Sequence, residues 1–194
     1  MNILLDDLPE AIVIDGKEYP INWDHRTGID CILDFESPEL TIEEKGLLLI
    51  RRLYKEPLPV NLSEAMRLGI KFLNAGNDNV EENPFADHYR LYSFEKDAGL
   101  IYAAFRQTHG IDLQKELLHW WVFLALFQDL GADTAFCSLV NLRRRVKSGQ
   151  ATKEEREHAI KMGEAFNLPE VDELLEPEEN ENVEIFARLA ERGM

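Results

Sequence analysis

The stretch DLQKELLHWWVFLALFQDL, residues 112–130, decides the fold of this chain. Every residue from Leu117 to Phe127 is apolar except His119, which comes directly before two tryptophans. The run is too short to cross a bilayer, for which a helix needs about 20 apolar residues. Because Asp112 is a favoured capping residue and Gly131 a common stop, the pattern predicts one helix over residues 112–130. A helix that is apolar on all sides is usually central and covered by its neighbours.

His119 could have a structural role or could bind a metal ion. A histidine in an apolar helix usually bonds to a carbonyl or a carboxylate, and we expect this structural role for His119. However, Glu116–His119 and Glu155–His158 repeat the Glu-x-x-His spacing of di-iron four-helix bundles. Such a site also needs carboxylates from two further helices, and residues 134–147 contain none. We therefore expect no metal and no other cofactor, and a di-iron bundle is the remote alternative.

The charge of the chain limits its partners. Thirty-seven acidic side chains oppose 21 basic ones, which gives a net charge of −16. Such a surface repels phosphate, so we expect neither nucleic acid nor a membrane as a partner. The basic clusters RRLYK (51–55) and RRRVK (143–147) lie near predicted helix ends, where cations stabilise the helix dipole, and nucleic-acid contact is the weaker alternative.

Other motifs give no sign of catalysis. The sequence has no glycine-rich phosphate loop, nucleophile elbow or His-Glu-x-x-His zinc motif, so we predict that the protein is not an enzyme. Its two cysteines, Cys31 and Cys137, lie in apolar helical contexts, where buried free thiols are usual. Two cysteines provide neither a disulfide framework nor a zinc pattern, which favours a reducing, cytoplasmic environment.

The remaining segments predict a mostly α fold, in which an N-terminal β-hairpin precedes a bundle of about six to seven helices. Asp15-Gly16 favours the tight turn of a hairpin over residues 11–22, and Pro20 makes its second strand an edge strand. Helical spacing predicts the other helices at 24–37, 41–54, 61–76, 92–110, 133–149 and 152–166. Three of these starts carry capping signals, which are the capping boxes Thr41–Glu44 and Thr152–Glu155 and the pair Asn61 and Glu64.

The C-terminal part is strongly acidic. From Glu170 to Glu184 there are eight acidic residues and no basic one, which is typical of an acidic tail. Residues 182–193 could add a short amphipathic helix with Phe186 and Leu189 on its apolar face. The predicted organisation is a hairpin segment packed on the helical domain (1–23), a helical domain (24–166) and the acidic tail (167–194).

The aromatic residues of the central stretch are the candidate binding residues. We expect most of this stretch to be buried, but about six medium helices leave room for an uncovered patch. Tryptophan and phenylalanine are favoured anchors of protein interfaces, so such a patch would bind a protein. The predicted binding residues are Trp120, Trp121, Phe123, Phe127, Phe186 and Leu189.

Residues 92–147 resemble a bacteriophage family known as gene product fifteen, which occurs in siphophages and prophages of Gram-positive bacteria. The similar elements are Asp97 within EKDA, IYAAF (101–105), GIDL (110–113), LHWW (118–121) and F-x-AL (123–126). The arginine that follows the apolar face of the next helix is also similar. Family members usually have a tyrosine before the GIDL glycine, where this chain has His109.

The resemblance implies a role in tail assembly. The genes of this family usually lie between those of the major tail protein and the tape measure protein, which is the position of tail assembly chaperones. By this analogy, the protein keeps the tape measure protein soluble in the host bacterial cytoplasm and is absent from the mature virion. Further partner candidates are the major tail protein, a second tail assembly chaperone and a second copy of the chain. A structural virion component of the tail or connector is the alternative.

Overall fold

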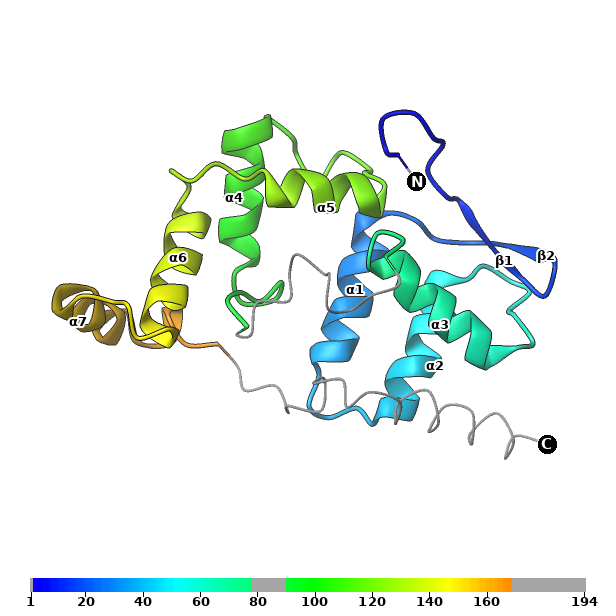
Figure 1. Cartoon of the computed structure of the whole chain (residues 1–194), viewed down its shortest axis with the longest axis horizontal. Coiled ribbons are helices and arrows are strands. Elements are labelled where there is room, and N and C mark those ends of the chain that lie inside the picture. The colour runs from blue at the N-terminus through cyan, green and yellow to red at the C-terminus, as the bar shows by residue number, and fades with distance from the viewer. Residues whose placement is uncertain (1, 78–89, 169–194) are drawn as a thin grey trace. The chain divides into compact units, whose positions relative to one another are not determined.

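Helices make up most of the described structure, as Figure 1 shows for the computed structural model of the chain. The structure describes residues 2–77 and 90–168. In chain order the elements are β1 (Ala11–Ile14), β2 (Lys17–Pro20), α1 (His25–Glu36), α2 (Ile42–Leu53), α3 (Leu62–Leu73), α4 (Ala98–His109), α5 (Trp120–Gln128), α6 (Ala135–Lys147), α7 (Lys153–Met162) and the 3-10 helix η2 (Gly163–Ala165). The prediction of a mostly α fold that begins with a β-hairpin is confirmed.

Two compact units divide the described residues. Unit 1 contains residues 2–77 and 119–121, and unit 2 contains residues 90–118 and 122–168. The boundary crosses α5, whose two tryptophans belong to unit 1 and whose remaining residues belong to unit 2. The predicted boundaries after residues 23 and 166 stay a prediction. Most of the predicted tail, residues 169–194, lies outside the described residues.

The hairpin of unit 1 turns at Asp15 and Gly16, as predicted. Both residues have positive φ angles, 50° and 76°, which the two central positions of a tight hairpin turn require. Strands β1 and β2 are antiparallel. Beyond β2 the chain also pairs with the end of α2, because Asn22 N donates to Leu53 O at 2.7 Å and Lys55 N donates to Pro20 O at 2.9 Å. The hairpin is thereby joined to the helices of unit 1.

Capping residues set the starts of the three helices in unit 1. The Asp24 carboxylate accepts from two amides of α1, and Thr41 forms the predicted capping box of α2 with Glu44. The Asn61 side chain caps α3. Helix α2 packs against both α1 and α3. Between α2 and α3, a Cβ on Gly69 would lie 3.2 Å from a Leu53 methyl carbon, so this glycine allows the two helices to approach closely.

Unit 2 has a core of aromatic rings. Helix α4 ends at Gly110, whose φ of 72° is left-handed as expected of a helix stop, and α6 packs against both α4 and α7. The capping box of α7, predicted from Thr152 and Glu155, is confirmed. Five phenylalanines are at most 7 % exposed: Phe94, Phe105, Phe123, Phe127 and Phe136.

The central helix is shorter than predicted. Helix α5 covers Trp120–Gln128 rather than residues 112–130. The Asp112 carboxylate caps a turn instead of this helix: it accepts from Gln114 N at 3.1 Å and from the Tyr102 hydroxyl at 3.0 Å. His119 forms an isolated antiparallel bridge with Asp24, a pairing between residues far apart in the chain. This long-range pairing places His119 before the helix rather than inside it.

Two other helix ends also differ from the prediction. The helix expected over residues 92–110 begins only at Ala98, because in the segment before it the buried Asp97 carboxylate accepts from the Ser93 amide. The helix expected over residues 61–76 ends at Leu73, and the chain then turns through Ala75 and Gly76 with positive φ angles of 55° and 85°.

Candidate functional site

The start of α5 joins several elements of unit 1 through an aromatic cluster, which consists of Trp23, Phe72, His119, Trp120 and Trp121. Trp120 is 1 % exposed, and its indole Nε1 donates to Leu73 O at 2.9 Å. The Trp121 Nε1 donates to Phe72 O at 2.7 Å. Both indoles therefore donate to carbonyl groups at the C-terminal end of α3, and Phe72 O also accepts from Ala75 N at 3.1 Å.

The position of the Trp120 ring requires a glycine at position 28 of α1. A Cβ on Gly28 would lie 2.2 Å from ring atom Cε3 of Trp120, which is far inside van der Waals contact. The Trp120 amide also donates to Trp23 O at 2.8 Å, just before α1. The ring of Trp120 thus contacts α1 directly while its Nε1 is bonded to α3.

His119 makes polar contacts within this cluster. Its ring stacks on that of Trp23 with 5.6 Å between centroids, and its Nδ1 accepts from Trp121 N at 3.1 Å. Because Nδ1 accepts, Nε2 carries the proton and donates to Pro9 O at 3.1 Å. Burial lowers the pKa of His119 below its ordinary value, although the Pro9 carbonyl and the Glu10 charge act in the opposite direction. This geometry fits the structural role expected from the sequence, and it fastens the N-terminal segment to unit 1.

The aromatic residues predicted to bind a partner lie mostly in the interior. Trp120, Phe123 and Phe127 are 1 %, 0 % and 6 % exposed, and Trp121 is half-buried. In unit 2, Phe123 stacks on Phe105 with 5.0 Å between centroids. A binding role for these rings stays a prediction, and it would require the core to open. The other two predicted binding residues, Phe186 and Leu189, lie outside the described residues.

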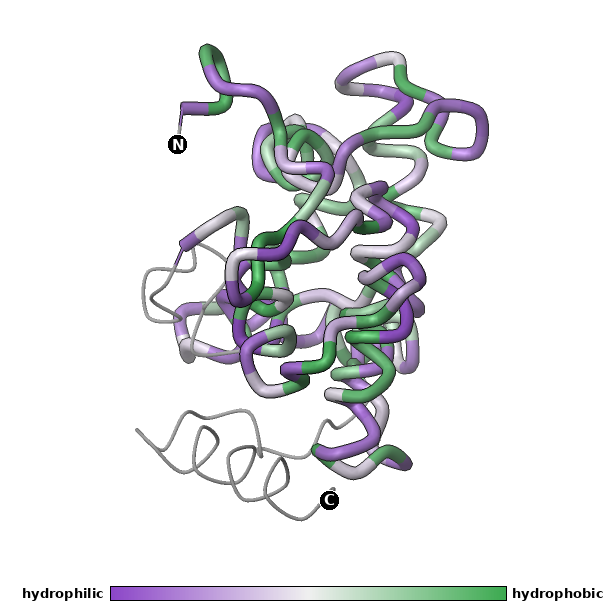
Figure 2. The backbone as a smooth tube through the Cα atoms, turned by 90° about the vertical axis from the view of Figure 1, so that its right-hand side faces the viewer, coloured by the Kyte–Doolittle hydropathy of each residue, from purple (hydrophilic) through white to green (hydrophobic). Residues whose placement is uncertain are grey.

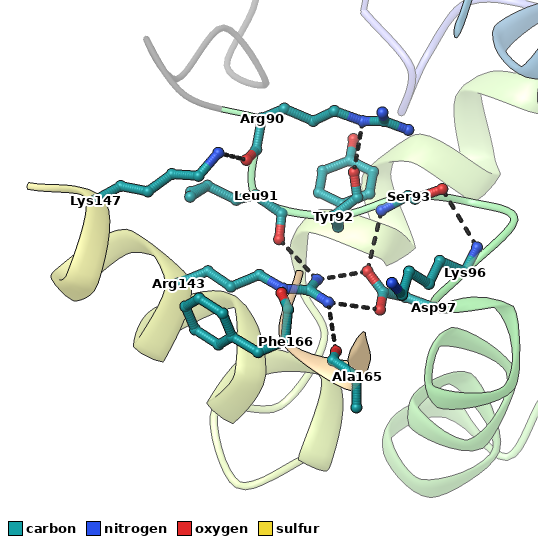
Figure 3. A network of polar contacts seen from close by, with 10 residues as sticks. All are labelled: Arg90, Leu91, Tyr92, Ser93, Lys96, Asp97, Arg143, Lys147, Ala165 and Phe166. Atoms are coloured by element: carbon teal, nitrogen blue, oxygen red, sulfur yellow. Dashed lines mark hydrogen bonds and ion pairs between the residues drawn. The ribbon is translucent and has the colours of Figure 1, made fainter. Parts of the chain in front are cut away.

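Unit 2 contains a buried ion pair between Asp97 and Arg143 (Figure 3). The two side chains are 3 % and 1 % exposed, and two hydrogen bonds of 2.6 Å and 3.0 Å join them. Asp97 also accepts from Ser93 N at 3.0 Å. Asp97 is the aspartate of the EKDA run, and Arg143 is the first arginine of the RRRVK cluster. Both motifs were noted in the sequence, but nothing in it indicated that these two residues are in contact.

The Arg143 guanidinium also binds three backbone carbonyls, as Figure 3 shows. It donates to Leu91 O at 3.1 Å, to Ala165 O at 3.0 Å and to Phe166 O at 2.8 Å. With its donors and the Asp97 oxygens satisfied, the buried charge is compensated. Arg143 therefore holds together the segment before α4, helix α6 and the end of η2.

The other basic side chains of the two clusters have mostly structural partners. Arg52 bonds to the Asp34 carboxylate through two nitrogens, and Arg145 lies 3.0 Å from Glu155. Lys147 Nζ donates to Arg90 O at 2.8 Å. Burial lowers the pKa of the Lys147 amine, and the neighbouring charges of Arg143 and Arg90 add to this effect. This agrees with the structural interpretation of the basic clusters.

The Glu-x-x-His pairs do not form a metal-binding arrangement in the described structure. Glu116 and His119 both precede α5, so they do not share a helix face as the di-iron pattern requires. Within residues 2–77 and 90–168, no group of three or more His, Cys, Asp or Glu side chains could hold a metal ion. Cys31 and Cys137 are free thiols, and burial raises the pKa of Cys31 to about 12.

Exposed apolar side chains are concentrated in unit 1. Of the nine large ones in the described part of the chain, seven belong to this unit: Ile3, Leu4, Leu5, Val13, Leu47, Val60 and Leu62. Leu117 and Ile160 are the two in unit 2. The exposure of these side chains was not predicted from the sequence, because several lie in turns, where helical periodicity gives no information. The available signal was an apolar run among acidic residues, ILLDD at positions 3–7.

Three of these side chains lie at one end of unit 1. The Asn61 side-chain nitrogen donates to the Asp15 carboxylate at 3.0 Å, so the hairpin turn lies beside the start of α3 (Figure 1). Val60 and Leu62 flank Asn61 and are 91 % and 42 % exposed, and Val13 of β1 is 62 % exposed. Contiguous exposed apolar side chains commonly mark a surface that binds another protein.

Comparison with known proteins identifies a phage protein. A family model described as bacteriophage Gp15 protein matches residues 4–168, which include all described elements. No curated protein and no solved structure shows significant similarity to the chain. Within the described part of the chain, no helix has the length and apolarity needed to cross a membrane.

Proposed function

Because the chain belongs to the bacteriophage Gp15 protein family, whose match points to a phage structural or assembly protein, we propose that it is a tail assembly chaperone. In this proposal it binds the tape measure protein without catalysing a reaction. It acts in the cytoplasm of the host bacterium and is not retained in the mature virion. The major tail protein and a second tail assembly chaperone are further partner candidates.

The observation that carries this proposal is the concentration of exposed apolar side chains in unit 1 of a very acidic chain. A protein that keeps a client with long apolar helix faces soluble needs apolar surface to contact these faces. It also needs charge elsewhere to keep the complex in solution. The exposed residues of unit 1 meet the first requirement, and the net charge of −16 meets the second.

Co-expression with the tape measure protein of the same phage tests the proposal. We expect the soluble fraction of the tape measure protein to rise when the full chain is present, and the two proteins to co-purify in mild salt. A double variant, Val13→Ser with Val60→Ser, should weaken the complex, because both side chains lie exposed at one end of unit 1. Ile160→Ser in α7 is the matched control, since this side chain is 79 % exposed but belongs to unit 2.

Two results would contradict the proposal. One is a tape measure protein that is equally insoluble with and without the chain and that forms no complex with it. The other is a stoichiometric amount of the chain in purified phage particles, measured by mass spectrometry. That second result would favour the alternative of a structural tail or connector component.

A further inference from the structure

The N-terminal turn of unit 1, residues 2–6, displays three consecutive large apolar side chains. Ile3, Leu4 and Leu5 are 45 %, 85 % and 82 % exposed. In Figure 2 this stretch is green between purple neighbours near the N-terminus. A single exposed leucine needs no explanation, because much of any protein surface is apolar. Three in a row on one turn form a small apolar projection that water solvates poorly.

Hydrogen bonds close this turn on itself. Asn2 O accepts from the amides of Leu5 and Asp6 at 3.0 Å and 2.9 Å, and the Asn2 side chain accepts from Leu4 N at 3.0 Å. The Asp6 carboxylate accepts from Asn2 N at 2.7 Å. The backbone that carries the three side chains is therefore already ordered, which lowers the entropic cost of binding a partner.

The residues that follow fix the turn to the rest of unit 1. Pro9 O accepts from the Nε2 of His119, and Glu10 O accepts from Ile21 N at 2.9 Å. The stem of the turn is thus bonded to the aromatic cluster on one side and to the hairpin on the other. Polar contacts hold the stem, while the leucines of the turn remain exposed to solvent.

The charge around the turn indicates the kind of partner. Residues 2–16 contain four acidic side chains and no basic one: Asp6, Asp7, Glu10 and Asp15. A partner surface that meets this segment gains from lysine or arginine side chains at its border. Three adjacent apolar side chains on a narrow turn fit an apolar groove rather than a flat surface.

From these observations we infer that the N-terminal turn is a docking element, which inserts Leu4 and Leu5 into an apolar groove bordered by lysine or arginine side chains on a partner protein. The inference rests on the proposed function, in which that partner is the tape measure protein. The inference goes beyond the proposed function by assigning the anchoring side chains and the chemistry of the groove.

Binding of the co-expressed tape measure protein to the full chain tests the inference. The double variant Leu4→Ser, Leu5→Ser should lower the affinity about tenfold or more, because two central apolar anchors are lost. Its melting temperature should stay that of the wild type, since both side chains are exposed. Ile160→Ser is the matched control for loss of an exposed apolar side chain, and it should bind like the wild type.

A charge variant tests the predicted border of the groove. Asp6→Asn with Asp7→Asn should weaken binding about threefold at low salt, and the difference should disappear at high salt, where charges are screened. A weakening that is the same at low and high salt would overturn the assignment of a basic border.

The outcomes separate the inference from the proposed function. If the wild type binds the tape measure protein and the Leu4→Ser, Leu5→Ser variant binds it equally well, the docking element is wrong and the chaperone function stands. If the wild type does not bind at all, the proposed function fails and the inference fails with it. A wild type that is dimeric by light scattering and a double variant that is monomeric would assign the turn to a second copy of the chain, which also overturns the inference.

Discussion

The two units place polar groups in their interiors in different ways. In unit 1 the polar side chains of the aromatic cluster are neutral, and His119 and the indoles of Trp120 and Trp121 donate to backbone carbonyls. In unit 2 the interior holds a full ion pair, Asp97 with Arg143, beside a core of phenylalanine rings. The aromatic cluster of unit 1 therefore requires His119 in its neutral form, whereas the interior of unit 2 depends on two charges remaining together.

This difference predicts that substitutions of buried polar side chains affect the stability of the two units differently. Removal of one partner from a buried ion pair leaves an uncompensated charge, which is among the most destabilising changes known for a single substitution. Removal of a neutral hydrogen bond costs much less. The units should therefore respond very differently to substitution and to pH.

The largest effect is expected for Arg143→Met. The change leaves the Asp97 carboxylate buried without its partner and deprives three backbone carbonyls of a donor, so it should lower the free energy of unfolding by about 3–5 kcal/mol. Denaturant unfolding measures this loss. Arg144→Met, one position further along α6 and exposed, is the matched control and should cost less than about 1 kcal/mol. Equal losses in the two variants would show that the ion pair does not hold unit 2 together.

Replacement of one glycine by alanine in each unit should give the next largest difference in stability. Gly28→Ala in α1 should destabilise the protein by about 1–3 kcal/mol, because the added methyl group overlaps the Trp120 ring. Gly99→Ala in α4 meets no atom within 4 Å and should be neutral or stabilise the protein by up to about 1 kcal/mol. Thermal melting of both variants checks the contrast. If Gly28→Ala melts with the wild type, the close contact between α1 and Trp120 is wrong.

The smallest effect is the pH dependence from His119. Its pKa is lower in the folded protein than the ordinary value of 6.5, so below that pH the unfolded chain takes up a proton more readily than the folded one. The contribution of His119 to stability is complete above pH 6.5 and decreases as the pH falls, by at most about 1.4 kcal/mol per pH unit. Denaturant midpoints between pH 7.5 and 5 should fall less in His119→Gln than in the wild type. Identical pH profiles would mean that His119 is not held in its neutral form.

Local sequence signals predicted the ends of many elements. Thr41, Asn61 and Thr152 cap their helices because capping depends on residues only three positions apart. The Asp15-Gly16 turn was predicted for the same reason. Long-range contacts explain the misplaced start of α5, since the bridge from His119 to Asp24 joins distant parts of the chain. No periodicity in the sequence reports such a pairing.

The candidate site could be predicted only in part. The LHWW motif was predicted to be important, and the structure buries Trp120 fully and Trp121 partly in unit 1. Leu4, Leu5 and Val60 were missed because nothing in a turn sequence states whether an apolar side chain will find a partner. Their exposure depends on which surfaces the folded helices cover, and this is a property of the tertiary structure.

Hydrogen–deuterium exchange of the full chain, measured with and without the tape measure protein, tests the central claim most directly. We predict slower exchange in residues 2–14 and 60–64 of unit 1 upon binding, and unchanged exchange in α7 around Ile160. Protection confined to unit 2, with unchanged exchange in both segments of unit 1, would contradict the assignment of the client-binding surface.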